Sequence, residues 1–300
     1  MNENWQTTMQ NHAKSFHLAA LFFPKNVFGK VKALYALCRW IDDAVDTAPN
    51  SISAQHRVQQ IIQDLRKPQP QMEVNRLYKQ NGLNPQYIED LVDGVMSDIG
   101  PVRMSNFIEF RKYCYKVAGV VGLAMADLMD VKEQKARAFA VDLGMAMQIT
   151  NICRDILEDA KNNRVYLPND LLAQHEIDQN QLVQLKTDEV ALSHATTQML
   201  ALADSYYLSA RLGYSSIPFR SRGAIIIAEK LYRAIGLKLL KSGARPLQGR
   251  TYLTGWEKSY WIFLGLIEWI ISPFSQKPTK HNEVLHKGLQ PWKESRKFLS

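Results

Sequence analysis

Cysteine is scarce in this chain, and no two cysteines have the spacing of a metal or redox motif. The three present, Cys38, Cys114 and Cys153, lie far apart within apolar helical patterns. An odd number without a Cys-x-x-Cys pair favours reduced, buried thiols over disulfides or a zinc site. The first residues also lack the basic and apolar regions of a secretory signal peptide. Both observations predict a cytoplasmic protein.

Long hydrophobic runs are also missing, since a membrane span takes roughly 20 apolar residues. The segment 260–274 comes nearest, and it is apolar apart from Glu268. A buried terminal helix is the favoured interpretation, and a helix lying at the inner face of the membrane is the alternative that its Trp and Tyr content suits. The lysine-rich remainder, 276–300, is expected to be a basic polar tail, partly disordered, with anionic headgroups as an alternative contact.

The charge balance is basic, with a net charge of +8 and a pI of about 9.3. Such an excess suits anionic partners such as diphosphates, anionic lipid or nucleic acid. The Lys and Arg residues are scattered, however, and there is neither zinc-finger spacing nor an aromatic-glycine run typical of RNA-binding sheets. Nucleic acid is therefore not expected as a partner.

Strand patterns are rare, and helical periodicity dominates. The pattern predicts helices over 30–46, 132–159, 179–212 and 218–240. Asn106 and Glu109 resemble a capping box that opens a further long helix through Val117. Proline-rich breaks divide the chain into roughly eight to ten helices joined by short loops. With no repeat or linker, residues 1–275 are expected to form a single all-α domain.

Two aspartate clusters carry the clearest chemical signal. Asp42 and Asp46 are four residues apart, as are Asp155 and Asp159. On a helix this spacing places both carboxylates on one face, roughly 6 Å apart along the axis, where they repel unless a cation lies between them. Oxygen ligands so arranged suit Mg²⁺ bound together with a substrate phosphate. A solvated helix face is the alternative, but two such clusters with arginines beside them favour a metal-diphosphate site.

Polar residues and glycines near the clusters add weaker signals. Gln148 and Asn151 precede Asp155 at helical spacing, so one polar stripe faces either a cavity or solvent. Gly119 and Gly122 lie inside a helical pattern, where each costs roughly 1 kcal/mol relative to Ala. Close helix packing is the favoured explanation for these glycines, and room for a long apolar chain is the functional alternative. Four further residues are candidate contacts for diphosphate or a carbocation: Arg164, Tyr166, Tyr232 and Arg250.

With these residues in view, the chain resembles the squalene/phytoene synthase family, the head-to-head prenyl diphosphate synthases, from about residue 15 to 250. Three segments carry the resemblance: YALCRWIDDAVD at 35–46, YCYKVAGVVG at 113–122 and NICRDILEDAKNNRVYLP at 151–168. Head-to-tail prenyl elongation enzymes and terpene cyclases fit less well, because their second motifs differ. The bacterial phytoene and dehydrosqualene synthases are the members it resembles most.

The resemblance implies an isoprenoid synthase fold, a single helical domain around a central cavity. It implies a prenyltransferase that uses Mg²⁺, with Mn²⁺ as an alternative, and does not need NADPH. The metal ligands expected on this basis are Asp42, Asp46, Asn151, Asp155 and Asp159. The expected catalytic residues are Asp42, Asp46, Asp155, Asp159, Tyr113 and Arg39. The expected substrate-binding residues are Ser15, Phe16, Tyr35, Asp43, Val117, Val121, Gly122, Gln148, Asn151, Arg154, Arg164, Tyr166, Tyr232 and Arg250.

The implied reaction joins two prenyl diphosphates head to head through a cyclopropylcarbinyl diphosphate. We favour phytoene formed from two geranylgeranyl diphosphates, with C30 dehydrosqualene or squalene from farnesyl diphosphate as the alternative. Two alternatives of other classes are a non-catalytic family member acting in complex assembly, which would predict eroded aspartates, and a lipid-binding module. Both clusters are intact, which favours the enzyme. Pocket length decides chain length, and the sequence does not give pocket length.

Overall fold

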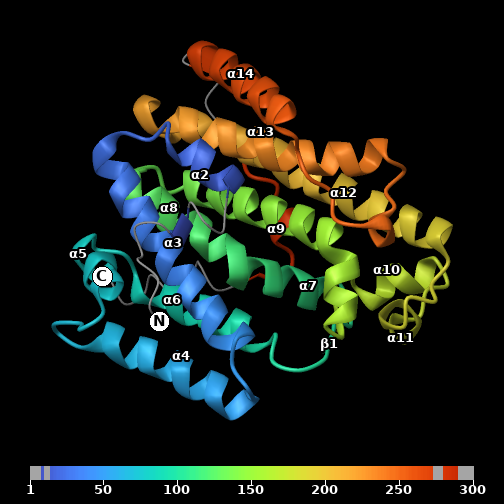
Figure 1. The fold of residues 1–300 in the computed structure, drawn as a ribbon. Coiled ribbons are helices and arrows are strands. Elements are labelled where there is room, and N and C mark those ends of the chain that lie inside the picture. Colours follow the sequence, from blue (N-terminus) through green and yellow to red (C-terminus); the bar gives the residue numbers. More distant parts are fainter. Residues whose placement is uncertain (1–7, 10–13, 273–279, 290–300) are drawn as a thin grey trace.

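One long helix, α9 (Ala136–Lys161), runs through the middle of the molecule (Figure 1). The computed structural model describes residues 8–9, 14–272 and 280–289. Helix α9 is buried on nearly every side, because its apolar residues contact α8 (Val120–Leu128), α12 (Glu189–Leu212) and α13 (Phe219–Lys241). A helix that is apolar around most of its circumference belongs in the core of a bundle. The described residues form one all-α domain.

The helices around α9 account for most of the described chain. In chain order they are α2 (Lys14–Ala20), α3 (Lys25–Asp46), α4 (Ser51–Arg66), α5 (Glu73–Gln80), α6 (Pro85–Met96), α7 (Phe107–Cys114), the π-helical turn η1 (Tyr115–Gly119), α8 (Val120–Leu128), α10 (Asn169–Gln174), α11 (Gln179–Val183), α12 (Glu189–Leu212), the 3₁₀ turn η2 (Tyr214–Ser216), α13 (Phe219–Lys241), the 3₁₀ turn η3 (Pro246–Gln248), α14 (Gly255–Ile271) and the 3₁₀ turn η5 (Glu283–His286).

Two short strands form the only sheet in the described part of the chain. β1 (Val102–Arg103) and β2 (Arg164–Val165) pair in parallel, with Val102 opposite Arg164. The strands follow α6 and α9 respectively, so their pairing ties the C-terminal ends of these two helices together. This pairing fixes the position of the Arg164 backbone beside Val102.

The predicted helix over 179–212 is in fact two helices, α11 and α12. Leu185 has a φ of +56°, a left-handed conformation that ends the first helix. Asp188 then caps the second, since its side chain accepts a hydrogen bond from the backbone N–H of Ala191. The helix predicted from 132 begins instead at Ala136, after a turn in which Asp130 is also left-handed.

The helix predicted from Asn106 is continuous but changes its winding. Asn106 caps it through Ile108 and Glu109, while Glu109 accepts from Ser105 rather than completing the predicted capping box. The π-helical turn η1 then separates α7 from α8. Such turns insert one extra residue into a helix and are frequent at functional sites.

Glycines allow α8 and α9 to approach each other closely. A Cβ added at Gly122 would lie 2.1 Å from the carbonyl oxygen of Ala140, and one at Gly144 would lie 2.3 Å from that of Ala118. Neither position can hold a side chain without moving the backbone. Close helix packing therefore explains Gly122, although the same residue also lines the cavity described below.

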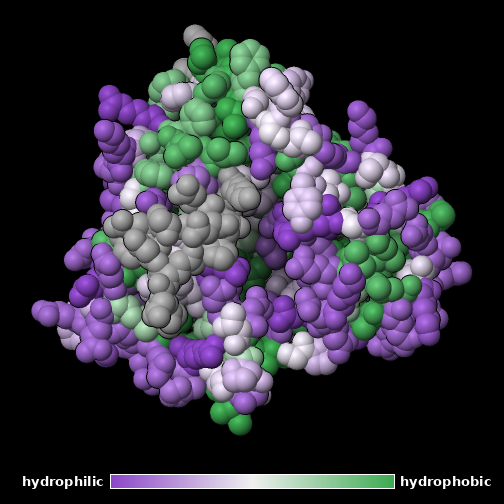
Figure 2. All heavy atoms as spheres, in the orientation of Figure 1, coloured by the Kyte–Doolittle hydropathy of each residue, from purple (hydrophilic) through white to green (hydrophobic). Residues whose placement is uncertain are grey.

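Helix α14 was predicted to be buried, and this prediction is wrong. Its inner face packs on α13, where Gly265 lies against Ile227, but Gly265 is its only buried residue. Its opposite face is apolar and exposed. Five residues spaced by three or four form this outer stripe of α14: Trp256, Tyr260, Phe263, Ile267 and Ile270. In Figure 2 hydrophobic side chains gather at the top of the molecule, over α14.

Among the residues that the structure describes, no helix combines the length and apolar character needed to cross a membrane. The predicted domain boundary at 275 falls within 273–279 and lies outside the described residues, as do 290–300 of the predicted tail. The described part of that tail, 280–289, packs on the helical body and buries Leu285 and Leu289 in the main core.

Candidate active site

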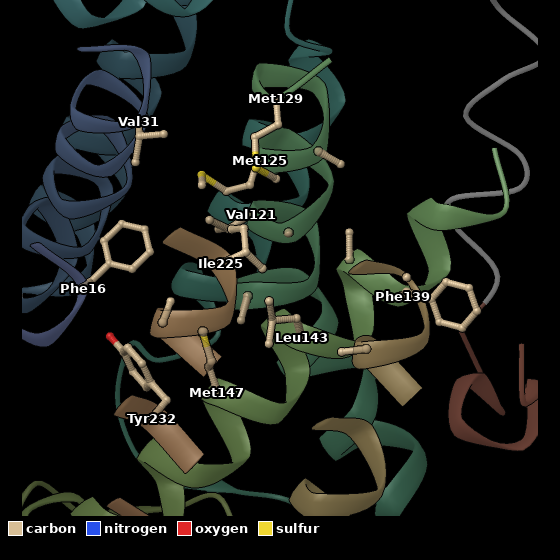
Figure 3. Close-up of a pocket in the computed structure, with 18 of the residues that line it drawn as sticks. Phe16, Val31, Val121, Met125, Met129, Phe139, Leu143, Met147, Ile225 and Tyr232 are labelled. Atoms are coloured by element: carbon tan, nitrogen blue, oxygen red, sulfur yellow. The ribbon is translucent and has the colours of Figure 1, made fainter. Parts of the chain in front are cut away.

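An elongated, mostly apolar cavity lies between α3, α8, α9 and α13. The space between its lining atoms, together with the open solvent at its mouth, is about 1280 Å³. Figure 3 shows side chains from these helices converging on it. Eight predicted site residues line the cavity: Phe16, Tyr35, Val117, Val121, Gly122, Gln148, Asn151 and Tyr232. Ser15 lies half-buried on α2, directly before Phe16, whose ring stacks on Tyr35 with 6.0 Å between centroids.

The cavity has a polar end and an apolar far end. Gln148 and Asn151 of α9 lie at the polar end, and Phe139 lines the cavity twelve residues earlier on the same helix. At 1.5 Å per residue this separation is roughly 18 Å. Met129 and Ile217 are further apolar residues that line the cavity. The cavity can therefore hold a long hydrocarbon with its polar head at one end.

The first aspartate cluster extends the α3 face that lines the cavity. Cys38 lines the cavity, and Asp42 and Asp46 follow it at successive turns of the helix. Burial, together with repulsion from Asp46, raises the pKa of Asp42 to about 7, although Arg39 opposes the rise. Asp43 points to another side of α3, where it forms a 2.6 Å ion pair with Arg39.

The second cluster extends the facing stripe of α9. Asp155 and Asp159 follow Asn151 at successive turns. Arg154 donates to both carboxylate oxygens of Asp155, and Arg250 Nε lies 2.9 Å from Asp155 Oδ1. The structure thus places Arg250 beside the second cluster. Burial, followed by repulsion from Asp155, raises the pKa of Asp159 to about 7.

A third carboxylate, Asp98, joins the two clusters, and sequence reasoning missed it. It follows α6, and it accepts hydrogen bonds from Tyr113 at 3.0 Å and Tyr166 at 2.8 Å. The two tyrosine rings stack with 4.8 Å between centroids. Burial raises the pKa of Asp98 to about 6, against the effect of both hydrogen bonds. Asp98 stands alone in the sequence, so no spacing pattern marks it.

Electrostatic coupling shows that the clusters share one end of the cavity. Asp98 interacts with Asp42 and Asp159, which lie on different helices. Arg164, at the start of β2, lies 3.4 Å from Asp46 and also acts on Asp159. Carboxylates from α3, from α9 and from the turn after α6 therefore meet at the polar end, with arginines around them.

The donor set fits a divalent metal ion. Asn151 Oδ1 is buried and has no hydrogen-bond partner among the residues that the structure describes, as expected of a ligand oxygen. The raised pKa values of Asp42 and Asp159 reflect buried carboxylates with too little compensating positive charge. Oxygen donors of this kind suit Mg²⁺ or Mn²⁺.

We expect the metal-free protein to lose stability as the pH rises from about 4 to about 7. The unfolded carboxyls of Asp42 and Asp159 titrate near 3.9, whereas the folded ones titrate at about 7. Between these pH values the unfolded state releases protons that the folded state retains, so the free energy of unfolding falls as the pH rises. Above about pH 7 the free energy of unfolding stays at this lower value. Urea unfolding with a chelator, across this range, measures the effect.

Asp42→Asn is the matched variant for this titration, since it removes one of the carboxyls whose pKa burial raises. It should show a smaller pH dependence than the wild type, and added Mg²⁺ should flatten the wild-type curve because the ion binds only the folded state. Identical pH dependence in the variant and the wild type would contradict the assignment of the titration to these carboxyls.

Comparison with known proteins identifies the family. Residues 9–257 match the family described as Squalene/phytoene synthase. The chain belongs to this family. The 15-cis-phytoene synthase of Enterobacter agglomerans is 34% identical over 81% of this chain and 87% of its own length. The 15-cis-phytoene synthase of Pantoea ananas is 33% identical, covering 84% and 86%.

A solved dehydrosqualene synthase in complex with ligand superposes with a TM-score of 0.80 at 23% identity, covering 89% of this chain and 95% of that one. The predicted family, the isoprenoid synthase fold and the prenyltransferase class of the enzyme are confirmed. Members of this family act on prenyl diphosphates and generally depend on a divalent metal.

Proposed function

We propose that this protein joins two molecules of geranylgeranyl diphosphate head to head to form phytoene. The observation that carries the proposal is the meeting of two aspartate clusters and several arginines at one end of a long apolar cavity. The curated relatives at 33–34% identity that are named phytoene synthases support the choice of product.

The polar end would hold the diphosphate groups. The residues that would bind Mg²⁺ or Mn²⁺ are Asp42, Asp46, Asn151, Asp155 and Asp159. When bound, the metal supplies charge that stabilises the departing diphosphate. Arg39, Arg154, Arg164 and Arg250 lie beside these carboxylates, and each offers a planar pair of donors to phosphate oxygens.

The apolar cavity would hold both hydrocarbon chains and exclude water from the cations that form. Loss of diphosphate from one substrate leaves an allylic cation, which the double bond of the second attacks to give a cyclopropylcarbinyl diphosphate and one proton. Loss of the second diphosphate, rearrangement and loss of another proton then give phytoene. The aromatic rings of Phe16, Tyr35 and Tyr232 line the cavity and can stabilise positive charge. Phytoene formation needs no hydride, so NADPH is not required.

Product analysis tests the proposal directly. The purified protein and Mg²⁺ are incubated with geranylgeranyl or farnesyl diphosphate, with and without NADPH, and the hydrocarbon is identified by mass spectrometry. Phytoene from the C20 substrate without NADPH is the expected result. A C30 product alone would reassign the protein to dehydrosqualene or squalene synthesis. A folded protein that makes no product from either substrate would favour the non-catalytic alternative.

We also propose that the enzyme is cytoplasmic and binds the membrane surface through the outer stripe of α14. Its five residues are 43–88% exposed, from Ile267 to Trp256, and Trp and Tyr favour the membrane interface. The net charge of +8 favours anionic headgroups. Contact with the membrane would suit the long, apolar prenyl chains of the substrate and the product.

Flotation with vesicles that contain anionic lipid tests this membrane contact. We expect the double variant Trp256→Ser, Phe263→Ser to lose most binding while keeping its turnover in detergent. Val190→Ser, another exposed apolar residue, on α12, is the matched control and should bind as the wild type does. Equal flotation of all three proteins would exclude this stripe as the membrane contact.

A further inference from the structure

Segment 280–289, within the tail predicted to be polar, is anchored to α9 by a buried carboxylate. Asp142 is fully buried, and its two oxygens contact the Nε2 atoms of His286 at 2.7 Å and His281 at 2.9 Å. Ser209 of α12 donates a third hydrogen bond to Asp142 at 2.6 Å. Between the two histidines, the Leu285 carbonyl accepts a hydrogen bond from Tyr206 of α12. The segment is therefore fastened to both α9 and α12.

This cluster is better described as a hydrogen-bonded anchor than as a metal site. The atoms of Asp142, His281 and His286 lie close enough to suggest a shared ion. A zinc ion bound to both atoms at its usual distances would hold nitrogen and oxygen about 3.3 Å apart. The observed 2.7 and 2.9 Å are direct hydrogen-bond distances. Within the described part of the chain, His281 Nδ1 also lacks the outer partner that metal-bound histidines usually have.

The anchored segment lies behind the far end of the cavity. Asp142 is one turn from Phe139, which lines that end, and the His281 ring packs against the Phe139 ring edge to face with 5.5 Å between centroids. Figure 3 shows the Phe139 ring pointing away from Val121 and Met147, toward the outside of α9. Phe139 also fills the space beside Gly213, the residue after α12, where an added Cβ would lie 2.5 Å from the Cβ of Phe139.

Phe139 therefore closes the gap between α9 and α12, and His281 supports it from outside. Ala210 of α12 and Gly213, directly after this helix, also line the cavity, and Gly213 lies against Phe139. We propose that the 280–289 segment is the outer wall of the cavity and that His281 is a positioning residue limiting the length of prenyl chain that fits. The proposal rests on the proposed function only in taking a prenyl diphosphate as the ligand.

Binding of unreactive thiolodiphosphate analogues with C20 and C25 chains, measured by calorimetry, tests the proposal without requiring catalysis. In His281→Ala we expect the affinity for the C25 analogue, relative to the C20 one, to rise about tenfold, because Phe139 loses its support. His281→Phe keeps a ring against Phe139 and should restore the wild-type ratio. His56→Ala, an exposed histidine on α4, is the control and should leave the ratio unchanged.

Thermal unfolding separates a positioning role from a merely structural one. A His281→Ala protein with a lower Tm and an unchanged affinity ratio would overturn the proposal. Zinc retained by the wild type through dialysis against a chelator, and lost in His281→Ala, would also overturn it, since the cluster would then be a metal site. Failure of the proposed function would appear separately, as a wild-type protein that binds the analogues but makes no hydrocarbon.

Discussion

Asp42→Asn is expected to reduce kcat/KM about 10³-fold, equivalent to about 4 kcal/mol of transition-state stabilisation. The side chain keeps its shape but loses the negative charge that a divalent ion requires. Asp42 also lies one turn after Cys38, on the face of α3 that lines the cavity. The loss should appear mainly in kcat, since leaving-group departure depends on the metal more than the binding of the apolar chains does.

Asp178→Asn is a matched control for this substitution. Asp178 caps α11 by accepting hydrogen bonds from the backbone of Asn180 and Gln181, and Asn is an equally good cap. Steady-state kinetics should show wild-type turnover for it, with both variants folded by circular dichroism. A tenfold loss of kcat/KM corresponds to only about 1.4 kcal/mol of transition-state stabilisation. If Asp42→Asn retained a tenth or more of the wild-type activity, the prediction that Asp42 is a metal ligand would be wrong.

The spacing of the aspartates was enough to predict the clusters, because helix geometry is local. Four residues make slightly more than one turn, so Asp42 and Asp46 must share a face wherever the helix lies. The stripe from Gln148 to Asp159 was predictable for the same reason. Helical periodicity predicted the all-α domain, and the family resemblance implied the isoprenoid synthase fold. The structure and the comparisons confirm both.

Features that depend on tertiary contacts could not be predicted in this way. Asp98 is positioned by hydrogen bonds from Tyr113 and Tyr166, which come close to it only in the folded chain. Asp142 and His281 are 139 residues apart, and no periodicity connects them. Helix α14 looked like a core helix because its composition is apolar, but composition does not say which faces find a partner. In the structure only one face of α14 does.

The roles predicted for individual site residues remain predictions, and the cavity itself offers the sharpest test. A cavity wall and a packed core respond in opposite ways to a larger side chain. In a packed core, added methylenes force strain and cost about 1–3 kcal/mol. In a cavity the same atoms enter empty space and gain contacts, so stability is kept while the ligand is excluded.

Val121→Phe should therefore abolish about 99% of turnover with the C20 substrate and leave the free energy of unfolding within about 0.5 kcal/mol of the wild type. Val121 is half-buried and faces the cavity from α8 (Figure 3). A phenyl group there occupies the space between the polar and apolar ends, which a C20 chain must cross. The smaller C15 substrate should lose less activity, which kinetics with both substrates would show.

The neighbouring Val120→Phe is the matched control, because Val120 is 1% exposed and belongs to the packed core. We expect it to lower the free energy of unfolding by about 1–3 kcal/mol, while the fraction that stays folded keeps its preference for the C20 substrate. If Val121→Phe were instead the more destabilised of the two, or used the C20 substrate as well as the wild type does, the prenyl chains would have to lie elsewhere.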